Sequence, residues 1–529
     1  MNIMKNRVLL YYLGLITLVI GCNQPEMKEK TDRSFHYLDP YRPQIHYSRD
    51  TGWLSDPNGL YHLDGEWHLM FQGFSNREGL YKGTNWDHAV STDLLHWEHL
   101  PVVFKGGNQI SYYSGSVYVD TLNASGLGKN GQVPVLAYYT THPMGGHPVR
   151  PNQNMISLGY SLDNGKNWKY GDMHIIDNPS VPAERDPSVF WHEPSRKWVM
   201  ATIGDHRIRF YSSENLLKWT FESEALQGSS WECPDLNTMT VEETGEQKVV
   251  LITSKHGVPN SSHGTAYHVG TFDGSRFLPE DTTGTGQWID WGSDFYAGIT
   301  YSNVPDGRVL FQSWFGWPCQ INKVLSRTTK FSGTMNLIRE LTLHKDEAEN
   351  YYLKSNPIDE YKKLRRDSTI VNDLNISGRK NIRENMGSHE PLEIILDASI
   401  TEGAVFGIRL KNEFGEDYLF QYDNWQRQFI GDRTNAGTVP GHLSNSYNKM
   451  SRMPYKLKDN QLKLRIYWDV STFEVFVDGG KEAFSQLFYP REPFSVLEFF
   501  SFGGNTTIQS LKVYDLNSIW TNMESTGSN

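Results

Sequence analysis

The feature that most constrains the fold of this chain is a series of short apolar runs separated by turn-forming residues. Such runs cover residues 67–71, 133–140, 198–203, 249–253 and 309–314, and Gly, Pro, Asn and Asp lie between them. Apolar positions at helical spacing are scarce beyond residue 36. Because strands are short and bounded by turn residues, whereas helices need longer periodic stretches, the pattern predicts an all-β fold.

A weak internal repeat favours one all-β architecture. The stretches 91–97, 161–168 and 212–219 each follow an apolar run, and each reaches a tryptophan after a polar turn. Repeated units of this size are typical of the blades of a β-propeller. We therefore expect a propeller over residues 37–345.

The pattern changes beyond residue 345. Residues 346–374 are rich in charge, notably at 361–367, and predict a linker. Further on, apolar side chains occupy every second position from 462 to 468 and from 473 to 477, before the turn Asp478-Gly479-Gly480. This alternation predicts a hairpin with one buried face, within a β-sandwich over residues 375–517. Residues 518–529 are polar and predict a frayed tail.

The N-terminus has the composition of a targeting segment. Lys5 and Arg7 precede an apolar run over residues 8–20, which is short for a membrane span and ends at Gly21-Cys22. Residues 1–21 resemble a secretory signal peptide, and their end resembles a bacterial lipobox, in which the cysteine is lipidated. We therefore expect lipidation of Cys22, a polar tether over 22–36 and anchoring at the outer membrane, facing the periplasm or the surface. A plain signal peptide and an uncleaved anchor are the alternatives.

The charge and cysteine content exclude several classes of protein. The formal net charge is −11 and the sequence has no basic stripe, so a nucleic-acid partner is not expected. The three cysteines are too few for a disulfide framework and form no Cys-x-x-Cys metal spacing. The chain contains 16 Trp, 28 Tyr and 25 Phe, which suits clefts where rings stack on sugars.

Three carboxylates stand in unusual local contexts. Asp56 and Asp186 each precede a proline, and Glu232 lies between a tryptophan and a cysteine. Taken alone, Asp56 is typical of a turn, Asp186 of a salt-bridged loop and Glu232 of a strand end. Because a residue before proline prefers an extended backbone, we expect Asp56 and Asp186 to be extended.

Together, in an aromatic-rich all-β chain, the three carboxylates indicate hydrolysis of a glycosidic bond. In one form of this reaction a carboxylate attacks the anomeric carbon, while a carboxylic acid protonates the leaving oxygen. A third carboxylate can bind the sugar more tightly as positive charge develops in the transition state.

The motifs around these residues resemble those of glycoside hydrolase family 32, the invertase, inulinase and levanase family. They follow the family's order along nearly the whole chain beyond the tether: Tyr41-Arg42-Pro43-Gln44-Ile45-His46, residues 53–59, Phe71-Gln72, residues 86–91, Tyr113-Ser114-Gly115-Ser116, Arg185-Asp186-Pro187, residues 232–236, residues 294–297, Arg339-Glu340-Leu341 and residues 469–476.

The resemblance implies a five-bladed β-propeller followed by a C-terminal β-sandwich, and a retaining mechanism on β-fructofuranosides. By position, Asp56 matches the nucleophile, Glu232 the acid/base and Asp186 the transition-state stabiliser. The positions that match a terminal fructose subsite are Trp53, Ser55, Gln72, Ser114, Arg185 and Trp314.

The implied chemistry needs no metal and no cofactor, and the implied partner is a fructan or sucrose. A retaining mechanism predicts that the carboxyl groups of Asp56 and Glu232 lie about 5–5.5 Å apart. It also predicts a raised pKa at Glu232, so that this group is protonated when the nucleophile is not.

The chain departs from the family pattern at a few positions. Ser55 stands where asparagine is usual, and serine lacks the two donors of an amide. Asp87 stands where glycine is usual. The leading hypothesis is exo-acting release of fructose from levan, inulin or sucrose. Endo cleavage or fructosyl transfer is the second, and a non-catalytic fructan-binding lipoprotein the third. The motifs match a hydrolase of arabinose or xylose polymers less well, and the oligomeric state stays open.

Overall fold

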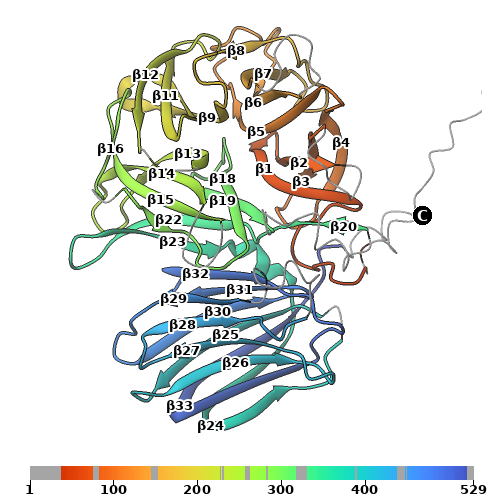
Figure 1. The fold of residues 1–529 in the computed structure, drawn as a ribbon, viewed down its shortest axis with the longest axis vertical. Coiled ribbons are helices and arrows are strands. Elements are labelled where there is room, and N and C mark those ends of the chain that lie inside the picture. Colours follow the sequence, from red (N-terminus) through yellow and green to blue (C-terminus); the bar gives the residue numbers. More distant parts are fainter. Residues whose placement is uncertain are drawn as a thin grey trace, which may run out of the picture.

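The computed structural model describes residues 37, 39–74, 83–144, 153–226, 228, 231–256, 263–281, 284–316, 330–387, 390–437, 447 and 449–520. Two β-rich bodies lie one above the other in Figure 1, a propeller and a sheet sandwich. The predicted all-β fold class is confirmed. The described residues contain two short 3-10 helices, Glu193–Ser195 and Asp359–Leu364. No helix in these ranges is long and apolar enough to cross a membrane.

Five antiparallel sheets form the blades of the propeller. The first contains β1 (Gly52–Leu63), β2 (Glu66–Phe74), β3 (Asn85–Ser91) and β4 (Glu98–Phe104), with β20 (Phe331–Ser332) parallel to β1. The second contains β5 (Ile110–Val119), β6 (Val135–Pro143), β7 (Met155–Ser161) and β8 (His174–Ile176). The third contains β9 (Arg185–His192), β10 (Lys197–Gly204), β11 (Arg207–Ser213) and β12 (Thr220–Ala225).

The last two blades carry additional short strands. The fourth contains β13 (Trp231–Thr240), β14 (Gln247–His256), β15 (His263–Phe272), β16 (Phe277–Pro279) and β17 (Gln287–Trp288). The fifth contains β18 (Phe295–Thr300), β19 (Val309–Phe315), β22 (Arg339–Lys345), β23 (Tyr351–Pro357) and β21 (Thr334–Met335).

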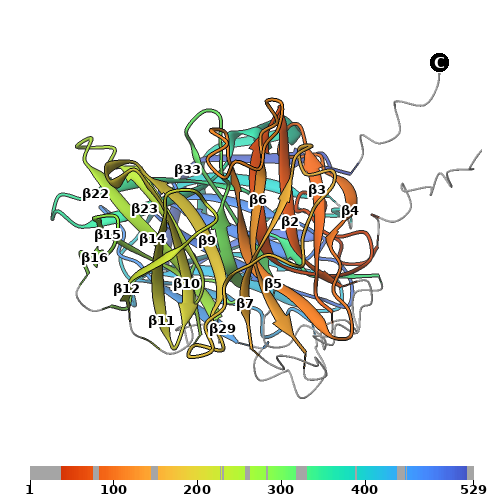
Figure 2. The same cartoon turned by 90° about the horizontal axis from the view of Figure 1, so that it is seen from above.

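The innermost strands close the propeller into a ring, which Figure 1 shows face-on and Figure 2 shows edge-on. β1, β5, β9, β13 and β18 contact one another in this order, and β18 returns to β1. The five apolar runs predicted as strands are the second strands of the five blades, β2, β6, β10, β14 and β19. Their side chains are mostly buried, because the neighbouring blades cover both faces of each sheet.

The weak sequence repeat marks the same turn in three blades. Ser91, Ser161 and Ser213 end the third strand of their blades, and each Oγ accepts the backbone N–H two residues on, at 3.2, 3.3 and 3.2 Å. The repeat therefore reflects a shared turn after the third strand, and the predicted five-bladed propeller is confirmed.

The second body is a ten-stranded sheet that folds over into a sandwich. Its strands are β24 (Arg365–Arg383), β25 (Leu392–Ile400), β26 (Val405–Lys411), β27 (Asp417–Asp423), β28 (Gln428–Asp432), β29 (Met450–Pro454), β30 (Gln461–Trp468), β31 (Thr472–Val477), β32 (Glu482–Leu487) and β33 (Val496–Leu516). The long β33 pairs with β26 through its first half and with β25 through its second half. Apolar side chains from both layers fill the space between them.

The predicted hairpin forms between β30 and β31, but β31 does not have one solvent-facing side. All six of its residues are buried, since one face packs in the sandwich core and the other packs against the propeller. The backbone N–H of Trp291 in the propeller donates to the carbonyl of Ala483 at 2.9 Å. The two bodies therefore share a continuous interior at this boundary.

The predicted domain boundaries need three corrections. The linker over 346–374 is wrong, because β23 completes the fifth blade within it and β24 of the sandwich begins at Arg365. The sandwich accordingly starts before residue 375. The tail is ordered as far as residue 520, where Ile519 is buried and Trp520 stacks on Tyr37 at 4.2 Å. Charge misled the prediction, since exposed edge strands also carry charged side chains.

Several predictions concern residues outside the described ranges. The signal peptide over 1–21, Cys22, the tether over 22–36, Cys319 and the end of the tail after residue 520 all belong to this group.

Candidate active site

The three carboxylates lie on inner strands of three different blades. Asp56 belongs to β1, Asp186 to β9 and Glu232 to β13, each within the first five residues of its strand. They lie close enough to repel one another electrostatically. The fold brings these residues, which are predicted to act together, to one end of the central ring.

Each carboxylate sits at an irregularity of its strand. The pairing register shifts near Asp56 in β1 and after Glu232 in β13. The register between β9 and β10 shifts between Ala201 and Ile203 of β10, opposite the start of β9, where Asp186 lies. Asp186 has a φ of 58° and Cys233 a φ of 47°, both in the left-handed region. The predicted extended backbone at Asp186 is therefore wrong. Bulges override the preference of a residue before proline, and they re-aim side chains towards a site.

Asp56 is held by uncharged donors. Ser114 donates its hydroxyl to Oδ2 of Asp56 at 2.8 Å, and the Gln72 amide lies 3.5 Å from the same oxygen. The amide of Gln72 also donates to Ser114 Oγ at 2.5 Å. Ser55, one residue before the carboxylate, is buried, and its hydroxyl has no hydrogen-bond partner within the described ranges.

Glu232 is held by stronger donors. Arg185 donates from Nη2 to Oε1 at 3.2 Å, His256 Nε2 lies 3.2 Å from Oε2, and the Tyr296 hydroxyl donates to Oε2. Asp186 lies beside this group, with its Oδ2 accepting the backbone N–H of Cys233 at 3.1 Å. Thr140 Oγ1 accepts the backbone N–H of Asp186 at 2.9 Å.

The surroundings distribute protons unevenly among the carboxylates. Burial, with repulsion from Glu232 and Asp186, raises the pKa of Asp56 to about 7, although the Ser114 hydrogen bond opposes this. Burial also raises the pKa of Asp186 against the charge of Arg185. Burial alone would raise the pKa of Glu232, but His256, Arg185 and Tyr296 together lower it. The predicted raised pKa at Glu232 is therefore wrong for the unliganded protein, because three donors favour its ionised form.

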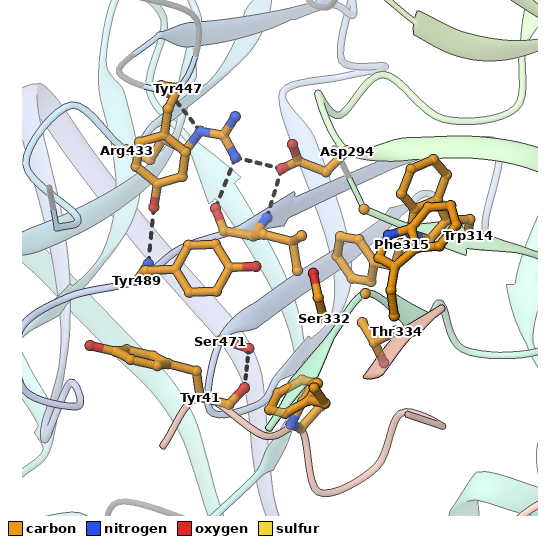
Figure 3. Close-up of a pocket in the computed structure, with 16 residues that line it drawn as sticks. Tyr41, Asp294, Trp314, Phe315, Ser332, Thr334, Arg433, Tyr447, Ser471 and Tyr489 are labelled. Atoms are coloured by element: carbon orange, nitrogen blue, oxygen red, sulfur yellow. Dashed lines mark hydrogen bonds and ion pairs between the residues drawn. The ribbon is translucent and has the colours of Figure 1, made fainter. Parts of the chain in front are cut away.

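Trp53 and Trp314 contact each other and line a small cavity between the propeller and the sandwich. Their ring centroids lie 6.0 Å apart, and neither indole N–H has a hydrogen-bond partner in the part of the chain that the structure describes. Figure 3 shows Trp314 and Phe315 facing the Asp294–Arg433 ion pair across this cavity, whose volume is about 30 Å³. None of the three carboxylates lines it. The two indoles thus lie where the strand carrying the nucleophile candidate meets the sandwich.

Three residues of the site were not predicted from the sequence. Tyr296 belongs to a stretch that resembles the family, but the resemblance gave it no role. Thr140 lies in β6, in an apolar run that predicts only a strand, and His256 is the last residue of β14. No sequence pattern marks either residue as part of a site. Within the described ranges, no cluster of three or more His, Cys, Asp or Glu is arranged to hold a metal ion.

A half-buried group of three carboxylates at one end of a five-bladed propeller defines a glycoside hydrolase of the carboxylate-dependent class. Family models agree with this class along almost the whole described chain. The N-terminal domain of glycosyl hydrolases family 32 matches residues 46–357, and its C-terminal domain matches residues 360–515. The chain belongs to glycoside hydrolase family 32.

Named relatives and a solved structure agree with this assignment. The chain is 34% identical over 93% of its length to a levanase of a Bacillus species, and it spans 54% of that protein. It is 31% identical over 92% of its length to the extracellular exo-inulinase of Aspergillus awamori, and spans 96% of it. The crystal structure of that exo-inulinase covers 92% of this chain, with a TM-score of 0.82 and 29% identity.

Proposed function

We propose that the protein removes terminal β-D-fructofuranosyl residues from a fructan, levan or inulin, or from sucrose, with retention of configuration. The observation that carries this proposal is the grouping of Asp56, Glu232 and Asp186 in one site, at positions that match the family's catalytic motifs. The levanase and exo-inulinase relatives support a fructan as substrate.

In the first half-reaction Asp56 attacks the anomeric carbon of the fructosyl unit. The carbon–oxygen bond to the leaving group breaks as Glu232 delivers its proton to that oxygen. In the second half-reaction Glu232 takes a proton from water, the water oxygen bonds to the anomeric carbon and Asp56 is released. Asp186, next to Arg185, binds fructose hydroxyls more tightly as positive charge develops.

The uneven protonation of the free site has a consequence for this mechanism. The chemistry needs Asp56 ionised and Glu232 protonated, whereas the unliganded site favours the opposite arrangement. To react, the free site therefore has to lose a proton at Asp56 and to protonate Glu232, and we expect substrate binding to favour this arrangement by displacing water from Glu232.

We further propose that Cys22 carries a lipid that anchors the enzyme to the outer membrane of a bacterium. The apolar run followed by Gly21-Cys22 supports this proposal. Expression of the full chain with labelled palmitate should label the protein and place it in the membrane fraction. Cys22→Ala should be unlabelled, and an unlabelled parent chain would contradict the proposal.

The function is tested by product release from levan, inulin and sucrose by residues 23–529. Early release of free fructose, absent in Asp56→Asn, is the expected result. Oligosaccharides without early fructose would instead indicate endo cleavage, and transfer products would indicate fructosyl transfer. A folded protein that binds a fructan and releases nothing would contradict the proposed enzyme and favour a binding protein.

A further inference from the structure

A histidine that no sequence motif marks contacts Glu232 at the rim of the site. His256 is the last residue of β14, and its Nε2 lies 3.2 Å from Oε2 of Glu232. The imidazole is 41% exposed, against 28% for the Glu232 side chain. The contact therefore joins the half-buried carboxyl group to a ring with more access to solvent.

The other two donors to Glu232 cannot exchange a proton with it near neutral pH. The Arg185 guanidinium is a donor only and stays charged. Burial raises the pKa of the Tyr296 phenol well above its ordinary value, and the charge of Glu232 adds to this, so the phenol stays protonated. An imidazole, in contrast, can both accept and donate a proton in this range. Among the three donors, His256 alone has this chemistry.

Charged and titratable groups face the pair from five other strands. They are Asp56 on β1, Arg185 and Asp186 on β9, Cys233 on β13, His263 on β15 and Tyr296 on β18. Lys255, next to His256 on β14, has its Nζ over the Trp231 ring. The His263 ring lies 3.9 Å from that of His256. Burial, with the neighbouring His256, lowers the pKa of His263 to about 4, so His263 is neutral at neutral pH.

We propose that His256 is a positioning residue that shares one proton with Glu232 and so sets the alkaline limit of the reaction. In one form the proton is on Glu232 and His256 Nε2 accepts it in a hydrogen bond. In the other form the proton is on Nε2 and the carboxylate of Glu232 accepts. The first form supplies the acid for bond cleavage, and the second supplies the base that activates water.

A proton shared between Glu232 and His256 gives a pH dependence of kcat/KM that a fixed positive charge at His256 does not give. The fraction of molecules with the proton on Glu232 stays constant until the pair as a whole loses it. An imidazolium facing a carboxylate keeps its proton to higher pH than a carboxylic acid alone does. The alkaline limit of kcat/KM therefore belongs to the pair. If His256 acted only as a positive charge, removing it would move this limit to higher pH.

This inference rests on the proposed function, and it is tested by kcat/KM profiles over pH with the substrate that the wild type hydrolyses best. In His256→Asn, Glu232 has to hold the proton without a partner, so we expect the alkaline limit to move to lower pH. Relative to wild type, kcat/KM should fall at least about tenfold more near pH 7.5 than near pH 5. His256→Lys, which cannot accept a proton in this range, should behave in the same way.

His206→Asn is the matched control, because His206 is exposed on the turn between β10 and β11 and has a φ of 63°, which asparagine tolerates. Its profile should equal that of the wild type. An alkaline limit that is unchanged in His256→Asn or moves to higher pH would overturn the inference, as would an equal loss at every pH. An inactive wild type would instead overturn the proposed function, before any variant is compared.

Discussion

The protein contains two buried groups of charges with nearly the same composition. The candidate active site has three carboxylates, Asp56, Asp186 and Glu232, beside one arginine and one histidine. The boundary between propeller and sandwich has three as well, again with one arginine and one histidine: Asp290, Asp469, Glu474, Arg339 and His46.

The two groups differ in how fully the charges are matched. At the boundary, His46 lies 3.0 Å from Asp469 and 2.9 Å from Glu474, and Arg339 bonds Glu474 and Asp290 at 2.5 and 2.9 Å. All five side chains are buried, with exposed fractions of at most 3%. In the active site the donors that Asp56 receives from the described residues are uncharged, and Arg185 and His256 remain partly exposed.

The pairing of the charges, rather than the composition of the group, distinguishes a structural charge group from a reactive one. At the boundary, Arg339 and His46 lower the pKa of Glu474 against the effect of burial, and removing either partner would leave a buried charge uncompensated. Under-paired carboxylates repel one another and compete for a proton, which is the condition a nucleophile and an acid need.

The sharpest test of the comparison is Asp56→Asn, for which we expect opposite effects on activity and stability. Loss of the nucleophile should lower kcat by about three orders of magnitude or more. Thermal unfolding should occur at an equal or higher temperature, because the substitution removes a buried charge that repels Glu232 and Asp186. A marked loss of stability would contradict the view that this carboxylate is under-paired.

At the boundary we expect the reverse from Arg339→Met. Removing this guanidinium leaves Asp290 buried without a cation and Glu474 with His46 alone, which should cost about 3–5 kcal/mol of unfolding free energy. Chemical denaturation measures this cost. Arg207→Met, which removes an exposed partner of Glu224, is the control and should cost less than about 1 kcal/mol. Equal costs would show that the boundary group is not stabilising.

The pH dependence of stability should identify His46. Burial lowers its pKa, but Asp469 and Glu474 outweigh this and raise it from 6.5 to about 9. A raised pKa in the folded state means that the stabilisation is fully present below pH 6.5 and is lost as the pH rises through about 9. The loss is of the order of 3 kcal/mol. Urea unfolding between these pH values should show it, and His46→Gln should be less stable and show a flatter dependence.

The smallest effect is expected at Ser55, whose buried hydroxyl has no hydrogen-bond partner among the described residues. Ser55→Ala should change unfolding free energy by less than about 1 kcal/mol, since no hydrogen bond is lost. It should also change kcat/KM less than about threefold. A tenfold rise in KM would show instead that the hydroxyl binds the sugar and takes over part of the role of the family's usual asparagine.

The sequence predicted the architecture well because the information was local. Short apolar runs and a repeated turn at Ser91, Ser161 and Ser213 are visible without knowledge of the fold. The boundary after the fifth blade was missed because β23 and the start of β24 carry charged residues at sheet edges, as a linker does.

The site was predictable only in part, for a similar reason. Asp56, Asp186 and Glu232 occur in compact motifs, so their types and spacing are visible. His256 reaches Glu232 only because β14 pairs with β13 in this register, and nothing near it in the sequence indicates that contact. The low pKa of Glu232 likewise depends on three donors from three strands.

Trapping the fructosyl intermediate tests most directly whether Asp56 is the nucleophile. In Glu232→Gln, Asp56 should still attack a fructosyl substrate that has a good leaving group, but the resulting intermediate should be hydrolysed slowly, because the variant lacks the base for the second step. Quenching this reaction, digesting the protein and analysing the peptides by mass spectrometry should show one added fructosyl unit on the peptide containing Asp56. A fructosyl unit on another residue, or fructose release by Glu232→Gln with no modified peptide at any time, would contradict the account.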